Sequence, residues 1–365
     1  MGAIWRGEET VTRPEAGAPP EDASVDVSVL IPTLNEEAHV DETIASLRRQ
    51  EFDGQLEFLF IDGGSEDRTR EILDSARRED PRIRVLDNPR RRTPFALNEG
   101  LRHARGEFVA RMDAHAAPPA DYLARGVERL RRGDVDWVSG PQLASGNGRW
   151  ASRIALALTT RLGVGGASFR NATHEIETDT GYLGVWRRRT LLELEGWDEE
   201  WVLNQDSELA ARVREAGGRI VCVPEMAVRY TPRESLRGLA RQYWRYGQYR
   251  AKTCRAHPSS MRRSHVLPPG LVLSLGTALL PLRRLSVVAR TSLAAYVVAL
   301  IATMIGRFGN ARWRDVLSLP IVLVTMHITW GAGFIVGSIR FGPPLAALCR
   351  LAGLDRVRSS STQGR

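Results

Sequence analysis

Residues 108–115 read FVARMDAH, a largely apolar run that stops at an acidic residue. A run this short, bounded by polar residues, is typical of a strand buried within a sheet. Side chains two positions apart in an extended chain point the same way, so Asp113 and His115 face one side. A carboxylate and an imidazole at a strand end can bind a divalent cation. The alternative is that Asp113 only caps the strand end and His115 is an ordinary surface histidine.

Composition limits what surrounds this stretch. The 365 residues suffice for one full domain core and a second region. Three cysteines, Cys222, Cys254 and Cys349, have neither disulfide-framework nor zinc-site spacing, which favours a reducing, cytoplasm-facing location. The net charge of +8 suits anionic lipids or phosphates. Nucleic acid is not expected as a partner, because the arginines are spread along the chain without a recognisable binding module.

Short apolar runs alternate with helical patterns on both sides of the stretch. We expect strands at 27–31, 56–61, 83–86, 108–112 and 135–139, and helices around 40–47, 68–78, 94–104 and 119–132. Such alternation predicts an α/β fold, a mostly parallel sheet flanked by helices. Residues 1–24, which are proline-rich and lack a signal-peptide core, are expected to form a disordered tail.

Polar loops follow three of the expected strands. They read PTLNE at 32–36, DGGS at 62–65 and DAH at 113–115. Pro, Asn, Asp, Gly and Ser are common in turns, so any one of these loops could be an ordinary turn without a ligand. Ligands of parallel sheets bind where such loops converge, so the three together favour one shared crevice. The chain has no GxGxxG and no Walker lysine, so a nucleotide would be held by carboxylates on its base and ribose and by a metal on its phosphates.

These loops, in this order, resemble those of the family 2 glycosyltransferases, whose nucleotide-sugar domain has the GT-A fold. The resemblance rests on VSVLIPTLNEE at 27–37, IDGGSED at 61–67 and RMDAHA at 111–116, and it covers about residues 25–252. It implies that Pro32 and Glu36 line the nucleotide pocket and that Asp62 contacts the base. It also implies that Asp113 and His115 hold Mg²⁺ or Mn²⁺ on the diphosphate, with DAH standing where most members have DxD.

The second half of this region offers candidate acceptor residues. A glycine-rich segment at 163–170 presents backbone amides and Arg170 to a phosphate, although a plain flexible connection fits it equally. Asp206 stands at an expected helix start, where a capping role is the simplest reading. The resemblance instead implies that Asp206 is the general base of a single displacement that inverts the anomeric centre, with Glu208 as second candidate.

A basic, aromatic helix and three apolar stretches complete the chain. The helix at 235–252 has the pattern of a membrane-surface helix, and its QYWRY resembles a family motif that implies acceptor binding by Gln242 and Arg245. Of the stretches at about 266–282, 285–305 and 316–339, only the last clearly reaches the roughly 20 residues that cross a bilayer. Arginines flank every boundary, so the positive-inside rule gives no clean topology for these stretches.

The sequence thus predicts five regions: a tail (1–24), a GT-A domain (25–232), an interface helix and linker (233–264), membrane-associated helices (265–342) and a C-terminal tail (343–365). We expect an inverting glycosyltransferase at the cell membrane, its catalytic domain facing the cytoplasm. It would move a sugar from a nucleotide-diphosphate donor to a lipid-linked saccharide in exopolysaccharide or cell-envelope glycan synthesis. The alternatives are a nucleotidyltransferase on a similar sheet and a non-catalytic nucleotide-sugar-binding assembly protein.

Overall fold

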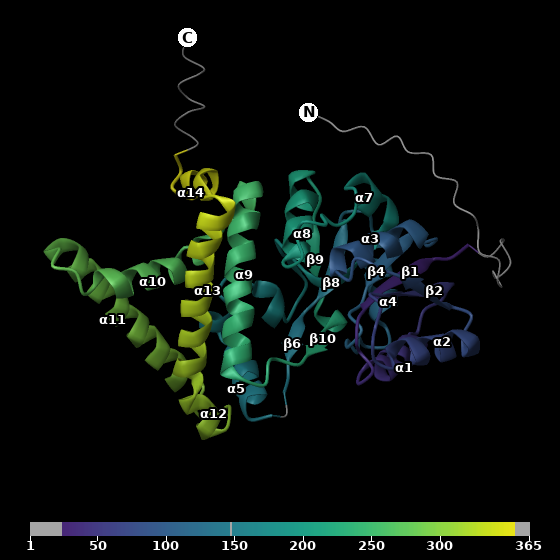
Figure 1. The fold of residues 1–365 in the computed structure, drawn as a ribbon, viewed down its shortest axis with the longest axis horizontal. Helices are drawn as coiled ribbons and strands as arrows, with labels where there is room; N and C mark the ends of the chain where they lie inside the picture. Colours follow the sequence, from purple (N-terminus) through teal and green to yellow (C-terminus); the bar gives the residue numbers. More distant parts are fainter. Residues whose placement is uncertain (1–23, 147, 355–365) are drawn as a thin grey trace, which may run out of the picture.

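A computed structural model describes residues 24–146 and 148–354. The predicted disordered tail therefore lies outside the described residues, apart from its last residue. The described chain forms a sheet domain and, beside it, a group of long helices (Figure 1).

The sheet domain is built on eight strands. Their order is β3 (Ile83–Asp87), β2 (Leu56–Asp62), β1 (Val27–Thr33), β4 (Phe108–Arg111), β8 (Tyr182–Arg187), β5 (Trp137–Gly140), β9 (Ile220–Cys222) and β7 (Ile176–Glu177). β1 pairs in parallel with β2 and β4, whereas β8 runs antiparallel to β4 and β5. The mostly parallel sheet is confirmed, and the carboxyl ends of β1, β2 and β4 meet at one edge.

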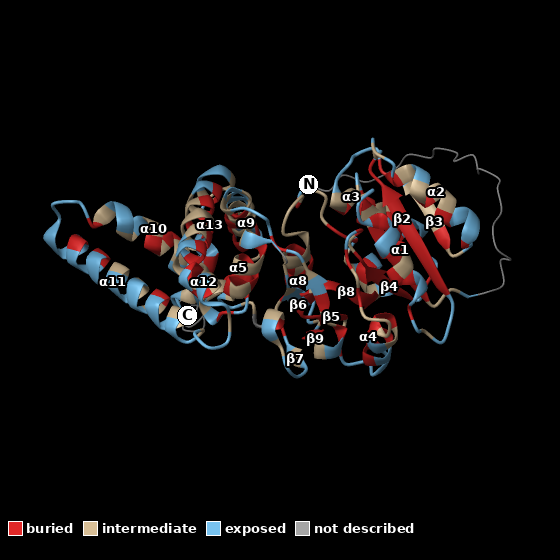
Figure 2. Cartoon of the chain, turned by 90° about the horizontal axis from the view of Figure 1, so that it is seen from below, coloured by how far each residue is buried: buried red, intermediate tan, exposed pale blue. Residues whose placement is uncertain are grey.

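Helices cover both faces of the sheet. One face packs against α1 (Val40–Arg48), α2 (Thr69–Glu79) and α4 (Tyr122–Arg131), and the other against α3 (Thr93–His103), α7 (Arg188–Glu193) and α8 (Gln205–Glu215). The expected apolar face of α1, formed by Val40, Ile44 and Leu47, is buried. Burial is concentrated in the strands between the two helical layers (Figure 2).

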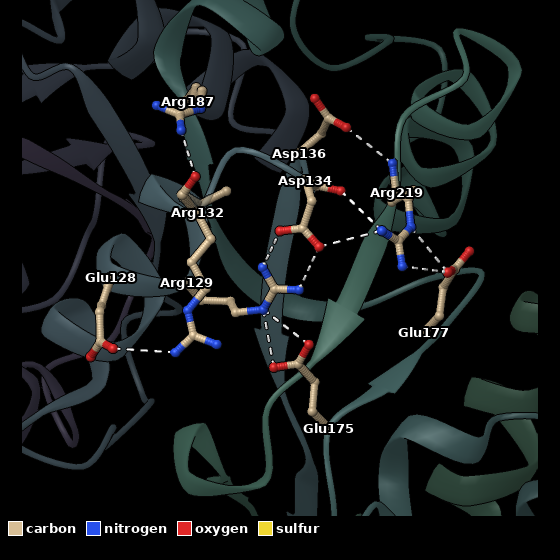
Figure 3. A network of polar contacts seen from close by, with 10 residues as sticks. Glu128, Arg129, Arg132, Asp134, Asp136, Glu175, Glu177, Arg187 and Arg219 are labelled. Carbon is tan, nitrogen blue, oxygen red and sulfur yellow. Dashed lines mark hydrogen bonds and ion pairs between the residues drawn. The ribbon is translucent and has the colours of Figure 1, made fainter.

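Ion pairs join α4 to the far edge of this sheet (Figure 3). Arg129 of α4 binds Asp134 and Glu175, and Arg219 binds Asp134 and Glu177. Arg129 is buried and bonded to two carboxylates, so it ties the segment just before the edge strand β7 to α4.

A small second sheet leads to the helical part. It consists of β6 (Gln142–Ala144) and β10 (Val228–Tyr230), and α5 (Arg149–Leu158) and α6 (Arg161–Val164) follow β6. The long helices are α9 (Leu236–Ala256), α10 (Leu267–Thr277), α11 (Arg283–Ile305), α12 (Trp313–Leu317), α13 (Leu319–Phe341) and α14 (Leu345–Leu351). The predicted C-terminal tail thus contains a helix, α14.

Glycines bring α9 and α13 into backbone contact along their length. A Cβ added to Gly247 would lie 2.1 Å from the carbonyl oxygen of Trp330, and one added to Gly333 would lie 2.2 Å from that of Trp244. Such small-residue contacts are how tightly packed helices approach each other. α9 therefore lies between the sheet domain and α13 (Figure 1).

Two segments are long and apolar enough to cross a membrane, namely Arg283–Ile305 and Trp313–Phe341. The expectation that only the last apolar stretch clearly has this length is therefore corrected, because α11 continues without a break through Arg290. α11 is also the more exposed of the two, with 17% of its apolar window buried against 39% for the other.

Candidate active site

A cavity of about 1990 Å³ opens at the sheet edge where the strand-end loops meet and extends beside α9 to the long helices. It is lined by residues of the loop after β1, the loop after β4, the start of α8, and α9, α10, α11 and α13. Glu36, Asp113, His115, Arg170, Asp206 and Gln242 are all among the lining residues, so most of the predicted site residues share one space.

The three loops converge as expected. The backbone N–H of Asn35 donates to Ser65 Oγ at 2.9 Å, and that of Gly63 donates to the carbonyl of Thr33 at 2.8 Å. His115 Nδ1 lies 3.2 Å from Glu36 Oε1. Loops that are far apart in the sequence are thereby held as one unit.

Arg111 joins Asp113 to Asp206. Its guanidinium is 5% exposed, and its Nη2 donates to Asp113 Oδ1 at 2.9 Å while Nη1 pairs with Asp206 Oδ1. Asp206 stands in the first turn of α8, which follows a left-handed Asn204. One buried cation therefore neutralises the predicted metal ligand and the predicted base together.

Sequence reasoning did not assign Arg111 a role. The sequence did contain a signal, because Arg111 lies within a run that was expected to be buried on both faces. A buried charge requires a partner of opposite charge, so a paired acid could have been expected. The acid that pairs with it lies 95 residues away, and nothing local to the strand identifies it.

The surroundings of Asp206 suit a proton acceptor. Burial raises the pKa of Asp206 above its usual range, and Arg111 opposes this rise. A raised pKa strengthens a base, while the arginine favours the ionised form that accepts a proton. Glu208, the second candidate, is 1% exposed, is bonded to Arg212 and His257, and does not line the cavity within the described chain.

Asp113 and His115, the two predicted metal ligands, both line the cavity. The hydrogen bond that His115 Nδ1–H donates to the Glu36 carboxylate raises the pKa of His115, and it leaves Nε2 as the ring nitrogen available to a metal. Asp113 supplies a carboxylate whose second oxygen lies 3.4 Å from the Tyr182 hydroxyl. The described residues contain no cluster of three or more His, Cys, Asp or Glu side chains placed to hold a metal, so further ligands would come from a bound diphosphate.

Asp62 and Pro32 were predicted to contact the nucleotide. Asp62 is 3% exposed and accepts hydrogen bonds from the backbone N–H and the hydroxyl of Ser65, the latter at 2.6 Å. Arg70 lies 3.6 Å from the same carboxylate. Neither Asp62 nor Pro32 is among the described residues that line the cavity, so Asp62 shapes its own loop in this structure.

On α9 the cavity is lined by one helical face. Gln242, Tyr246 and Arg250 follow one another at four-residue intervals and share that face, and Gln242 donates to the Tyr246 hydroxyl at 2.9 Å. Arg245 is exposed and lies outside the described lining, so the structure does not bring it to the site. Arg250, which sequence reasoning did not single out, lies in the lining, and the four-residue period from Gln242 was the signal for it.

Comparisons with known proteins show what the chain as a whole is similar to. The model described as Glycosyl transferase family 2 matches residues 28–192. The succinoglycan biosynthesis protein ExoA of Rhizobium meliloti (strain 1021) is 31% identical over 309 residues, which cover 84% of this chain and 93% of that protein. A Methanococcus voltae protein described as a dolichyl N-acetyl-α-D-glucosaminyl phosphate 3-β-D-2,3-diacetamido-2,3-dideoxy-β-D-glucuronosyltransferase is 25% identical over 326 residues, covering 86% and 97%.

Among solved structures, the mannosyltransferase PcManGT of Pyrobaculum calidifontis, in complex with GDP-Man and Mn²⁺, has a TM-score of 0.53 at 21% identity. The match covers 85% of this chain and 90% of that chain. At this identity the likeness shows the shared GT-A fold.

Proposed function

This chain belongs to glycosyl transferase family 2, and from that premise we propose that it transfers a sugar from a nucleotide-diphosphate donor to a lipid-linked saccharide acceptor. The observation that carries the proposal is the Asp113–Arg111–Asp206 arrangement at one cavity wall. The relatives are named for succinoglycan synthesis and for a dolichyl-phosphate-linked sugar, which supports a role in polysaccharide or lipid-linked sugar synthesis.

The two carboxylates divide the reaction between them. The donor's diphosphate lies at the Asp113 and His115 end, and the acceptor hydroxyl lies near Asp206. As the hydroxyl oxygen forms its bond to the anomeric carbon, Asp206 takes the hydroxyl proton and the bond to the diphosphate oxygen breaks. Attack from the side opposite the leaving group inverts the anomeric carbon in one step.

A divalent metal completes the donor end. Asp113 and His115 would hold Mg²⁺ or Mn²⁺, which neutralises charge on the departing diphosphate when bound. The structurally related PcManGT was solved with Mn²⁺, which supports the use of a divalent ion in this fold.

The long helices support membrane attachment. Large apolar side chains are exposed on α11, such as Val298 at 65%, and in the connection between α10 and α11, where Leu279 is 88% exposed. The three unpaired cysteines support a catalytic domain that faces the reducing cytoplasm.

Product analysis tests the proposal. With membranes that contain the acceptor, the wild type should release a nucleoside diphosphate from a sugar donor in the presence of Mg²⁺ or Mn²⁺. Asp113→Ala should abolish this release, and His115→Ala should raise the metal concentration required. His39→Ala is the control, because this imidazole lies 6.4 Å from that of His115 between ring centres and has no assigned ligand role.

Two other outcomes would replace the proposal. Release of pyrophosphate would identify a nucleotidyltransferase. Donor binding without any turnover, with no phenotype for Asp206→Asn, would identify a non-catalytic binding module.

A further inference from the structure

The cavity continues past the reaction centre into an apolar chamber. Small-molecule sites usually measure about 300–1,000 Å³, and this cavity of about 1990 Å³ has room for a second ligand beside a nucleotide sugar. Its far end lies between α6, α10, α11 and α13 and is lined by Leu162, Leu271, Ala295, Ala299, Met326 and Trp330. Tyr296 and His327 also line this end, but they lie 2.8 Å apart, within hydrogen-bond distance of each other, and the apolar remainder suits a hydrocarbon chain.

Arg170 and Arg250 line the cavity between this chamber and Asp206, the proposed base, and neither has a carboxylate partner among the described residues. Arg250 donates to Ser207 Oγ at 2.9 Å and has no carboxylate partner among the described residues. Burial lowers the pKa of Arg250, which shows how costly its charge is in this position. Arg170 Nη1 is buried without a hydrogen-bond partner within the described part of the chain. Arg262, the third arginine here, is already paired with Asp179.

Guanidinium groups that lack a carboxylate partner are stabilised by an anion that accepts several hydrogen bonds, and phosphate oxygens do so well. The donor's own diphosphate is expected at the opposite end, beside Asp113 and His115. An anion at Arg250 therefore has to come from the second ligand. Ser207, which contacts Arg250, directly follows Asp206, so a sugar attached to that anion would begin within reach of the base.

We propose that Arg170 and Arg250 bind the phosphate or diphosphate of the acceptor, and that the apolar chamber holds the first part of its hydrocarbon chain. This inference rests on the proposed function, since it assigns the acceptor of the same site. Val298 and Ile301 are exposed apolar residues on α11, the helix that also contributes Ala295 and Ala299 to the chamber, so this helix faces both the outside and the chamber.

Binding of farnesyl diphosphate to the full-length chain in detergent, measured by calorimetry, tests the proposal. Arg250→Gln, Arg170→Gln and Ala299→Trp should each raise the Kd at least about tenfold, as the loss of a charged hydrogen bond or of the chain's space requires. Farnesol and inorganic diphosphate should each bind more weakly than farnesyl diphosphate.

Two matched controls use the same helices. Arg241→Gln removes an exposed α9 charge outside the described lining, and Ala302→Trp enlarges an exposed α11 residue outside it. Both should leave the Kd within about twofold of the wild type. Equal Kd values for Ala299→Trp and Ala302→Trp would refute the claim that the chamber holds the hydrocarbon chain. If an arginine variant fails to fold, Ala299→Trp still tests the proposal.

Competition separates the two possible sources of the anion. UDP and GDP should not displace farnesyl diphosphate competitively; if they do, the arginines serve the donor and the proposal is overturned. Release of nucleoside diphosphate by the wild type is measured separately. If this release is present and the Ala299→Trp effect is absent, only the acceptor site fails, whereas absence of sugar transfer by the wild type refutes the proposed function itself.

Discussion

Arg111 contacts two carboxylates that have different proposed roles. Asp113 is the proposed metal ligand and Asp206 the proposed base, and each is bonded to a different nitrogen of the same guanidinium. The planar fork of arginine allows this double contact, whereas a lysine ammonium is a single point charge. Arg111 therefore positions both groups while leaving the chemistry to them.

Replacement of Arg111 tests this positioning role. Arg111→Met leaves two partly buried carboxylates without their buried counter-charge, so the free energy of unfolding should fall by about 3–5 kcal/mol. Arg78→Met, which removes an exposed arginine from α2, should cost less than about 1 kcal/mol. The measurement is denaturant unfolding, and adding Asp206→Asn to Arg111→Met should restore part of the loss. If the two arginine variants unfold alike, the pairing contributes nothing to stability.

His257 shows a further effect at the scale of single residues. It lies at the end of α9 between Glu208 and Glu215 of α8, and Arg212 also binds Glu208. The hydrogen bond to Glu208 raises the pKa of His257 in the folded state, above the unperturbed value of about 6.5. A group with a raised folded pKa stabilises fully below its unfolded pKa, and this stabilisation is lost as the pH rises through the folded pKa.

We therefore expect the difference in free energy of unfolding between the wild type and His257→Gln to be largest below about pH 6.5 and to shrink in more alkaline buffer. Unfolding curves collected over this pH range measure it. A difference that grows with pH would contradict the assignment, because it would require a depressed histidine pKa.

At the scale of elements, α9 connects the active site to the long helices. One face carries Gln242, Tyr246 and Arg250 into the cavity, and Gly247 on another face meets the backbone of α13. Movement of α13 relative to α9 would therefore displace the cavity wall. Sequence analysis treated this helix as one lying at the membrane surface, and its packing against α13 adds a structural role.

The contact between α9 and α13 is tested by Gly333→Leu. A Cβ at this position lies 2.2 Å from the carbonyl oxygen of Trp244, so the helices must separate, and both thermal stability and sugar transfer should fall. Gly276→Leu on α10 is the control, because a Cβ there meets no atom within 4 Å. Equal effects of the two variants would show that the contact is not required.

At the scale of the whole molecule, local patterns were sufficient to predict the first half of the sheet. Apolar runs alternating with helices placed β1 to β5 in a parallel arrangement and their polar loops at one edge, as the structure confirms. The antiparallel insertion of β8 between β4 and β5 was not predicted, because strand order depends on long-range packing.

The rest of the site depends on contacts between distant segments. Tertiary packing decides that Arg111 pairs with Asp206. It also decides that Arg250, and neither Arg245 nor Asp62, is among the described residues that line the cavity. The greater exposure of α11 likewise depends on how the helices pack. The mean hydropathy of α11 is close to that of the segment containing α13, so the sequence alone does not distinguish them.

The central claim is that Asp206 is the base of a sugar transfer, and Asp206→Asn tests it most directly. The amide keeps the size of the side chain and a hydrogen-bond acceptor for Arg111 but is a far weaker base. Single-turnover transfer should fall on the order of 10²–10⁴-fold, while donor affinity stays within about threefold of the wild type. Transfer at the wild-type rate, or an equal loss of donor binding, would contradict the account.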